Sequence, residues 1–451
     1  MEGTVKKIRV RMKPFSLPIL LLILLILTFW SRQELAFAEQ DPTQTLASEA
    51  SEPAPQDTGR KYHTPLAGEP FHLDFMGRSI VIPARDRGNL ASLQLGGTFY
   101  FSELTDTTVE PLFALYMRRT WEQSRVRIVA SGLVNEADGA KSFGHPELLA
   151  RFENYTIPFS EKGFRRNEGV DESSLKWGML SAFLGAGLRY PVAPYQVDND
   201  LRLQVLGRVG YLYSKETSET GPNVKLPPDT MLYGVKLRGR YDGIRRNLME
   251  LPHTGMAAGF DLDFVYREDW ADYGNPSITF KKEDTQDYLI LSGYLAGAFG
   301  IPGLSEKNRL VAGVHGGFMD RKSADRYNVF RLDGGPFAQE TDDLHRPNYP
   351  GALDTVTLVS KYLLINLEYR RELLPFLYLE LRGAFIWGDR AAIIASNQIG
   401  FKSDSGQTAA IALTSGFLWK SQLYIEYAWD TGFLRDGKAG SSLTLVWSKS
   451  F

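Results

Sequence analysis

The sequence predicts an all-β fold: a single transmembrane antiparallel β-barrel of about sixteen strands, which follows a signal peptide. Three observations predict it. The N-terminus has a basic segment and then an apolar run, as secretory signals do. From about residue 78 onward, segments of roughly ten to fourteen residues alternate apolar and polar side chains. The last of these segments ends in an aromatic residue, Phe451.

Composition narrows the possible functions. The 451 residues carry a formal net charge of -2, which argues against binding to nucleic-acid phosphates. The chain has no cysteine, so disulfides, thiolate metal sites and thiol nucleophiles are not available to it. Its six histidines show no metal-ligand spacing, and we expect no metal and no cofactor. A mean hydropathy of -0.23 is too polar for a helical membrane protein but suits a barrel, in which every second side chain can be polar.

The first 38 residues are predicted to be a cleavable signal peptide. Basic residues between Lys6 and Lys13 precede the apolar run 17–30, and residues 36–38 (Ala-Phe-Ala) offer a small-x-small cleavage site. The run is shorter than the ~20 residues of a spanning helix, which favours cleavage over a permanent anchor. Residues 39–69 are rich in Pro, Ser and acidic residues and are predicted to be a disordered periplasmic linker. The barrel would then occupy residues 70–451.

The alternation is plainest in residues 423–430, where Leu, Ile, Tyr and Trp occupy the odd positions. Comparable strands are expected near 92–102, 109–119, 124–134, 147–156, 176–190, 200–215, 230–241, 254–268, 286–300, 308–319, 327–334, 358–371, 375–388, 407–419, 421–430 and 440–451. Such lengths match the ~9–11 residues that a tilted strand needs to cross lipid. A secreted β-sandwich or solenoid would also alternate, but strand length and aromatic residues at strand ends favour the barrel.

The final strand carries Trp447 and Phe451 on one face. This strand resembles the carboxyl-terminal signal by which the assembly machinery recognises outer-membrane proteins. We therefore expect a location in the bacterial outer membrane. The expected partners are outer-membrane lipid and lipopolysaccharide, the barrel assembly machinery during biogenesis, and no nucleic acid.

The second half of the chain contains a family resemblance, over about residues 230–451. Its first part is a hairpin with Asp242, Arg245, Asn247, Pro252 and Gly255. A glycine pair at 334–335, Glu-Tyr-Arg at 368–370 and an aromatic strand at 379–387 follow in order. This order resembles the bacterial surface-antigen family, the BamA- and TamA-like outer-membrane barrels.

The family places a loop motif inside the lumen, where its arginine pairs with an acidic residue of the barrel wall. The nearest match is the segment 344–351, in which Arg346 aligns with that arginine and Tyr349 and Gly351 follow. Pro347 replaces the glycine of the motif, which removes conformational freedom. Two interpretations stay open: a solvated loop arginine, or an inward-folded one paired with Glu368 or Glu380.

The resemblance implies transport across the outer membrane or protein assembly into it. It also implies a lumen plugged by the loop 333–357, and a first and last strand that pair imperfectly so that the seam can open sideways. We expect no room in the chain for the family's periplasmic repeat domains, which a periplasmic partner subunit could supply. The alternative is a passive diffusion pore, or a structural or surface-contact barrel without a gate.

No enzyme is expected. A G-x-S-x-G motif is missing from the sequence, and His315 has no serine on its own strand. His315 is therefore interpreted as a polar residue of the lumen. His253 is predicted to be a solvated turn residue.

Overall fold

The structure is a computed structural model that describes residues 64–75, 77–82, 86–101, 109–161, 173–275, 278–332, 334, 344–352, 357–395, 398–418, 420–434 and 438–451. The predicted signal peptide, 1–38, and residues 39–63 of the predicted linker lie outside this range.

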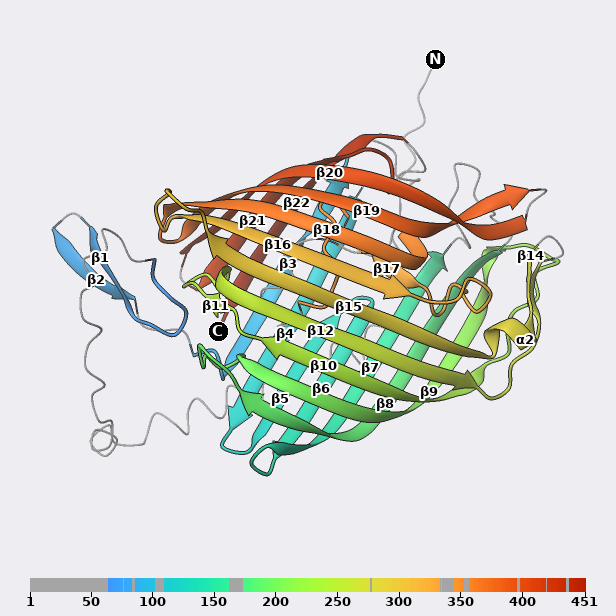
Figure 1. Ribbon diagram of the computed structural model, residues 1–451. Coiled ribbons are helices and arrows are strands. Elements are labelled where there is room, and N and C mark those ends of the chain that lie inside the picture. Colours follow the sequence, from blue (N-terminus) through green and yellow to red (C-terminus); the bar gives the residue numbers. More distant parts are fainter. Residues whose placement is uncertain are drawn as a thin grey trace, which may run out of the picture. The chain divides into compact units, whose positions relative to one another are not determined.

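Sixteen long antiparallel strands of the described chain close into one barrel (Figure 1). This confirms the predicted fold class. The strands are β3 (Leu90–Tyr100), β4 (Val109–Trp121), β5 (Ser124–Ser131), β6 (Val134–Ser142), β7 (Pro146–Glu161), β8 (Ser173–Pro191), β9 (Asp200–Thr220), β10 (Thr230–Asp242), β12 (Pro252–Arg267), β15 (Asp287–Gly300), β16 (Asn308–Phe318), β18 (Thr357–Leu374), β19 (Leu377–Ala395), β20 (Gln398–Leu418), β21 (Ser421–Asp430) and β22 (Gly440–Ser450).

Short elements accompany the long strands. β11 (Arg245–Arg246) and β17 (Phe330–Leu332) pair with the ends of barrel strands. β1 (Phe71–Phe75) with β2 (Arg78–Ile82), and β13 (Tyr273–Asn275) with β14 (Ile278–Phe280), form separate two-stranded sheets. The helix α2 (Lys282–Thr285) is a single turn. Among the described residues, no helix has the length and apolar character needed to cross a membrane.

Two expectations about the strands were wrong, although the total was right. The predicted strand 327–334 is only the three-residue β17, and the wall strand β6 was missed. The sequence of β6 is VNEADGAKS, and its two faces carry Glu and Asp on one side and Asn and Lys on the other. Neither face is apolar, so β6 lacks the alternation that reveals the other strands.

The barrel wall begins at Leu90 rather than at residue 70. Residues 64–69, expected in the disordered linker, are held against the turn between β10 and β12. Leu66 forms a bridge with Asn247, and the backbone N–H of Ala67 donates to the carbonyl of Arg246 at 3.0 Å.

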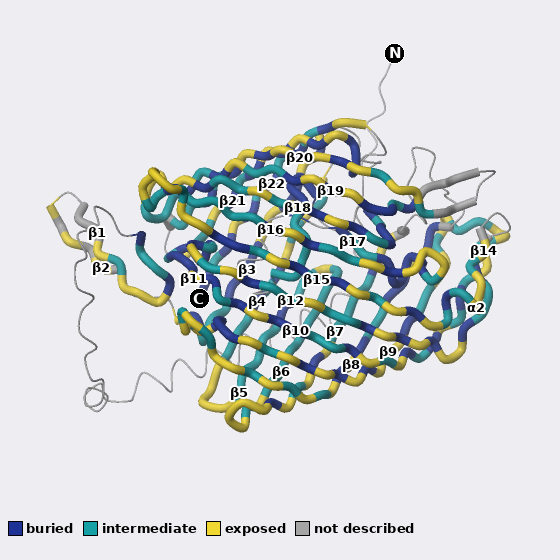
Figure 2. The backbone as a smooth tube through the Cα atoms, in the orientation of Figure 1, coloured by how far each residue is buried: buried dark blue, intermediate teal, exposed yellow. Residues whose placement is uncertain are grey.

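Outward side chains are mostly apolar and inward side chains are mostly polar. Figure 2 shows the alternation of burial along the strands. In β21, Leu423, Tyr427 and Trp429 are exposed, whereas Glu426 is 1% exposed inside the barrel. An outward band of apolar side chains around a polar interior is the pattern of a barrel in lipid, because lipid solvates only the apolar face.

The two ends of the barrel differ in their connections. Short turns such as 122–123, 143–145 and 375–376 lie at the end where β3 begins and β22 finishes. Most connections at the other end are longer, the longest being 319–356, although 132–133 is a two-residue turn. Outer-membrane barrels have short turns in the periplasm and long loops outside the cell. We therefore call these the periplasmic and the extracellular end.

The seam between β3 and β22 is fully paired. Nine consecutive residue pairs join the strands, from Ser442 with Tyr100 to Ser450 with Ser92, with no register shift. Inside the barrel, the hydroxyls of Thr98 and Thr444 lie 2.7 Å apart across it. The expected imperfect pairing of the first and last strands is thus not a feature of this structure.

Candidate functional site: the lumenal loop and its ion pairs

The segment 344–352, called the lumenal loop below, lies inside the barrel and contacts opposite parts of the wall. Its first half contacts β6, β15 and β16. Arg346 donates through Nη2 to Oε1 of Glu136 on β6 at 2.9 Å. Arg346 is therefore the inward-folded, ion-paired arginine of the two interpretations, but its partner is neither Glu368 nor Glu380.

Two histidines fix the start of the lumenal loop. His315 on β16 lies 2.9 Å through Nε2 from the carbonyl oxygen of Leu344. Since a carbonyl oxygen only accepts, His315 carries its proton on Nε2. His345 Nε2 lies 2.8 Å from the hydroxyl of Ser292 on β15. His315 is 6% exposed and is thus a lumenal polar residue, in agreement with its interpretation from the sequence.

The second half of the lumenal loop contacts the wall formed by β19 to β22. Asn348 accepts a hydrogen bond from Arg382 at 2.9 Å, and the N–H of Gly351 donates to Glu426 at 3.2 Å. Gly351 has φ +83°, a conformation that favours glycine. Tyr349 is fully buried and packs beside Phe433, with ring centroids 6.2 Å apart.

Glu368 and Glu380 act on the loop indirectly. Both lie near Arg370, and Glu368 also lies 3.7 Å from Arg382. Arg382 in turn pairs with Glu426 at 2.5 Å. These carboxylates therefore surround the arginine that binds Asn348, at the opposite end of the loop from Arg346.

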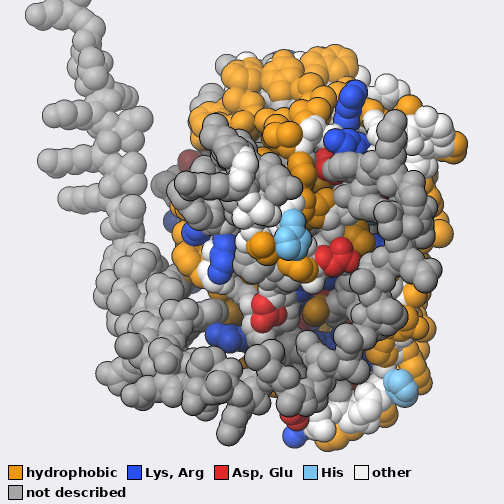
Figure 3. Space-filling model, turned by 90° about the vertical axis from the view of Figure 1, so that its left-hand side faces the viewer, with side chains coloured by type: hydrophobic (Ala, Val, Ile, Leu, Met, Phe, Trp, Pro, Cys, Tyr) orange, Lys and Arg blue, Asp and Glu red, His pale blue; other side chains and the backbone are white. Residues whose placement is uncertain are grey.

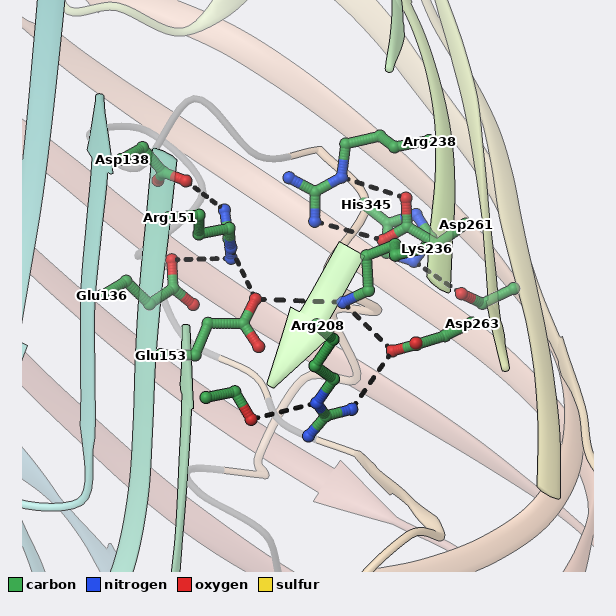
Figure 4. Close-up of polar contacts among 12 residues, drawn as sticks. Glu136, Asp138, Arg151, Glu153, Arg208, Lys236, Arg238, Asp261, Asp263 and His345 are labelled. Atoms are coloured by element: carbon green, nitrogen blue, oxygen red, sulfur yellow. Dashed lines mark hydrogen bonds and ion pairs between the residues drawn. The ribbon is translucent and has the colours of Figure 1, made fainter. Parts of the chain in front are cut away.

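Glu136 belongs to a group of charged side chains inside the barrel that we call the charged belt (Figure 4). Its members are Glu136, Asp138, Arg151, Glu153, Arg208, Lys236, Arg238, Asp261 and Asp263. Glu136 and Glu153 are direct cross-strand partners on β6 and β7. Two like charges in that position repel each other. Arg151 bridges them, at 3.5 Å from Glu136 and 2.5 Å from Glu153, and Arg346 adds a second positive charge beside Glu136. The loop arginine therefore stabilises a wall that carries an unfavourable carboxylate pair.

The charged belt continues across β9, β10 and β12. Lys236 lies 3.8 Å from Glu153 and 3.3 Å from Asp263, and Arg208 lies 3.6 Å from Asp263. Arg238 pairs with Asp261 at 3.1 Å. The charged belt thus links β6, β7, β9, β10 and β12 through the lumen, and Figure 4 shows its side chains.

Two cavities lie on either side of the charged belt and share no lining residue. The periplasmic cavity has a volume of about 170 Å³, and Asp138, Arg151 and Arg238 form its boundary with the belt. The extracellular cavity has a volume of about 280 Å³, and Glu136 and Glu153 form its boundary. The belt and the lumenal loop therefore interrupt the lumen near its middle.

The five residues of the hairpin signature form the periplasmic turn between β10 and β12. Asp242 pairs with Arg246 at 2.6 Å, whereas Arg245 is exposed. Asn247 accepts from the N–H groups of Met249 and Leu251, both at 3.0 Å, and Pro252 accepts from Arg370 at 2.8 Å. Gly255 has φ +113°, and a Cβ there would lie 2.2 Å from the carbonyl oxygen of Gly243.

This turn reaches across the periplasmic mouth. The carbonyl of Met249 accepts from Gln422 at the start of β21 at 3.1 Å, and Glu250 pairs with Arg87, just before β3, at 2.8 Å. Arg87 also pairs with Asp198 at 2.7 Å. Figure 3 views this end, where charged side chains of both signs lie near the centre and hydrophobic side chains lie at the top and on the right of the view. The signature residues therefore shape a cap over the mouth.

His253 was expected to be solvated, and this expectation was wrong. It is 5% exposed, with Nε2 lying 2.6 Å from Arg309 and 3.3 Å from Glu306. Within the described part of the chain, no three His, Asp or Glu side chains gather in a way that could hold a metal ion.

Sequence reasoning missed Glu136, the wall partner of Arg346. A signal was present in Glu136 and Asp138, two acids at period two beside Arg125 and Arg127 at the same period. Such a pattern places opposite charges on facing positions of a hairpin, as the observed pairing of Arg127 with Asp138 shows.

The fold and the lumenal site define a sixteen-stranded outer-membrane β-barrel with a loop folded into its lumen. A solved structure with this fold is CdiB from Acinetobacter baumannii, with a TM-score of 0.51 and 11% identity over 86% of this chain. The chain spans 66% of the CdiB chain. At this identity the likeness concerns the fold alone.

Two further solved structures are similar at lower TM-scores. BamA from Haemophilus ducreyi, lacking POTRA domains 1–3, has a TM-score of 0.49 and 10% identity over 85% of this chain and 75% of its own. The outer-membrane channel DcaP of Acinetobacter baumannii has a TM-score of 0.36 and 10% identity over 80% of this chain and 96% of its own. No family model matches the sequence, and no curated protein matches it.

Proposed function

We propose that this protein is a gated barrel that transports a substrate across the outer membrane or assembles a protein into it, and that the lumenal loop is its resting plug. The observation that carries the proposal is the double attachment of this loop, through Arg346 to Glu136 and through Gly351 to Glu426. Charge-assisted hydrogen bonds hold the loop in one position. Water can replace each of them when the loop moves, so the net cost of release is modest.

A passive diffusion pore is the rival function. Such a pore needs a continuous aqueous lumen, whereas the charged belt separates two cavities here and the turn around Met249 covers the periplasmic mouth. A structural or surface-contact barrel needs no movable plug at all. The gated function therefore accounts best for both obstructions.

The proposal also includes partners. Outer-membrane lipid and lipopolysaccharide would surround the outward apolar side chains, and the barrel assembly machinery would recognise Trp447 and Phe451 during biogenesis. A periplasmic partner subunit would deliver the substrate to the mouth. No catalytic step is part of the proposal.

Conductance in planar lipid bilayers tests the proposal. We expect the native protein to show a mostly closed state with rare openings. A double variant, Arg346→Ala with Asn348→Ala, should show steady open current because it loses a polar contact from each half of the loop. Large steady conductance of the native protein would instead support the diffusion pore. Unchanged closure in the double variant would exclude the loop as the plug.

A further inference from the structure

The periplasmic cavity has an unusual charge distribution. Eight arginines and four aspartates line it, with no lysine or glutamate. Some arginines on this wall, such as Arg238, pair with carboxylates that lie outside the cavity lining. The guanidinium groups therefore outnumber the carboxylates at the surface of the cavity.

Three arginines near the periplasmic mouth share only two carboxylates. Arg189 and Arg202 both bind Asp200, at 2.7 and 2.6 Å, and Arg125 binds Glu147 at 2.8 Å. All three arginines line the same cavity, so their like charges repel one another. The group, called the arginine triad below, carries one more positive charge than its two partners neutralise.

The arginine triad keeps hydrogen-bonding capacity toward the cavity. A guanidinium has five N–H donors, and one carboxylate engages at most two of them in the bidentate arrangement. The three side chains remain 23%, 29% and 27% exposed, so a solute in the cavity can reach them.

We propose that the arginine triad binds a small soluble polyanion, such as a phosphate ester or a di- or tricarboxylate. Forked donors from three strands match the several oxygens of such an anion. A monovalent anion would satisfy fewer donors and bind more weakly. This binding site does not depend on whether the barrel opens, so it stands or fails separately from the proposed gating.

Titration calorimetry of the detergent-solubilised protein tests the site, with pyrophosphate and citrate as probes and acetate as the monovalent comparison at constant ionic strength. We expect saturable binding of both polyanions. Arg125→Gln and Arg202→Gln should each weaken it about tenfold, the usual effect of losing a hydrogen bond to a charged group. Arg321→Gln is the matched control, because Arg321 pairs with Asp389 at the extracellular end.

A variant that is expected to strengthen polyanion binding distinguishes loss of the site from loss of folding. Glu147→Gln keeps a hydrogen-bonding side chain behind Arg125 but removes one of the two carboxylates, so it should tighten polyanion binding severalfold. No saturable binding to the native protein overturns the proposal, as does equal binding by all variants. Loss of polyanion binding when an anionic phospholipid is added to the micelles would also overturn it, since the site would then serve a headgroup rather than a soluble anion.

Discussion

Arg346 of the lumenal loop donates to Glu136 of β6 at 2.9 Å, beside the repulsive pair that Glu136 makes with Glu153. We expect Arg346→Ala to destabilise the barrel by roughly 1–3 kcal/mol, since it leaves a largely buried carboxylate without one of its cations. The measurement heats samples to a series of temperatures before electrophoresis and records the temperature at which the band of the folded barrel is replaced by the band of the unfolded chain. Arg346→Lys, which keeps the charge, is the control, and an unchanged transition in the alanine variant would contradict the ion-pair role.

Gly351 combines a left-handed backbone with close contacts. A Cβ there would lie 3.0 Å from the side chains of Ala428 and Ser442. Gly351→Ala should lower the free energy of unfolding in detergent by more than the ~1 kcal/mol expected from backbone strain alone. Gly303→Ala is the matched control, because Gly303 has a similar φ of +81° and nothing within 4 Å of the added Cβ. Equal losses in both variants would show that the wall contact is unimportant.

Asp198 lies in the turn 192–199, outside the spanning strands, and makes the stability of the folded protein depend on pH. Burial alone would raise the pKa of Asp198, but Arg118, Arg87 and further arginines outweigh it and lower the pKa to about 2. A lowered pKa stabilises the folded state above the unfolded pKa of ~3.9, by roughly 2–3 kcal/mol. This contribution disappears as the pH falls from about 4 toward 2.

The corresponding measurement compares urea unfolding of the native protein and Asp198→Asn across this pH range. We expect the native protein to be more stable at pH 6 and the difference to shrink toward pH 2. A difference that stays constant with pH would contradict the coupling.

The proposed gate could open sideways by separating β3 from β22. Because these strands are fully paired, a disulfide across the seam tests this route. A disulfide joining Thr98→Cys to Thr444→Cys should form readily, because these residues are cross-strand partners and the chain has no other cysteine. If the seam opens during function, this lock should abolish activity in cells that depend on the protein, and reduction should restore it.

The matched control is a lock between Ala182→Cys and Val209→Cys, which are cross-strand partners on β8 and β9, away from both the seam and the lumenal loop. Full activity of the locked seam would exclude lateral opening and leave the lumen as the route. Loss of activity in both locks would show a general need for flexibility instead.

The sequence by itself determined the barrel. A wall strand separates lipid from a polar lumen, so its residues alternate between apolar and polar, as in 423–430. This alternation can be recognised from the local sequence alone. The hairpin at 242–255 could also be predicted, because its buried asparagine and positive-φ glycine are local requirements of the turn. Where both faces of a strand carry polar residues, as in β6, the sequence lacks this alternation and does not reveal the strand.

Only the tertiary structure decided what the lumenal loop binds. Arg346 and Glu136 are 210 positions apart, and nothing in either local sequence specifies the other. Their meeting depends on how the closed barrel brings β6 opposite β19 to β22, with the loop between them. The same closure gathers Arg125, Arg189 and Arg202 around one cavity. Local periodicity specifies which side of the wall a side chain faces, but only barrel closure specifies which side chains meet inside.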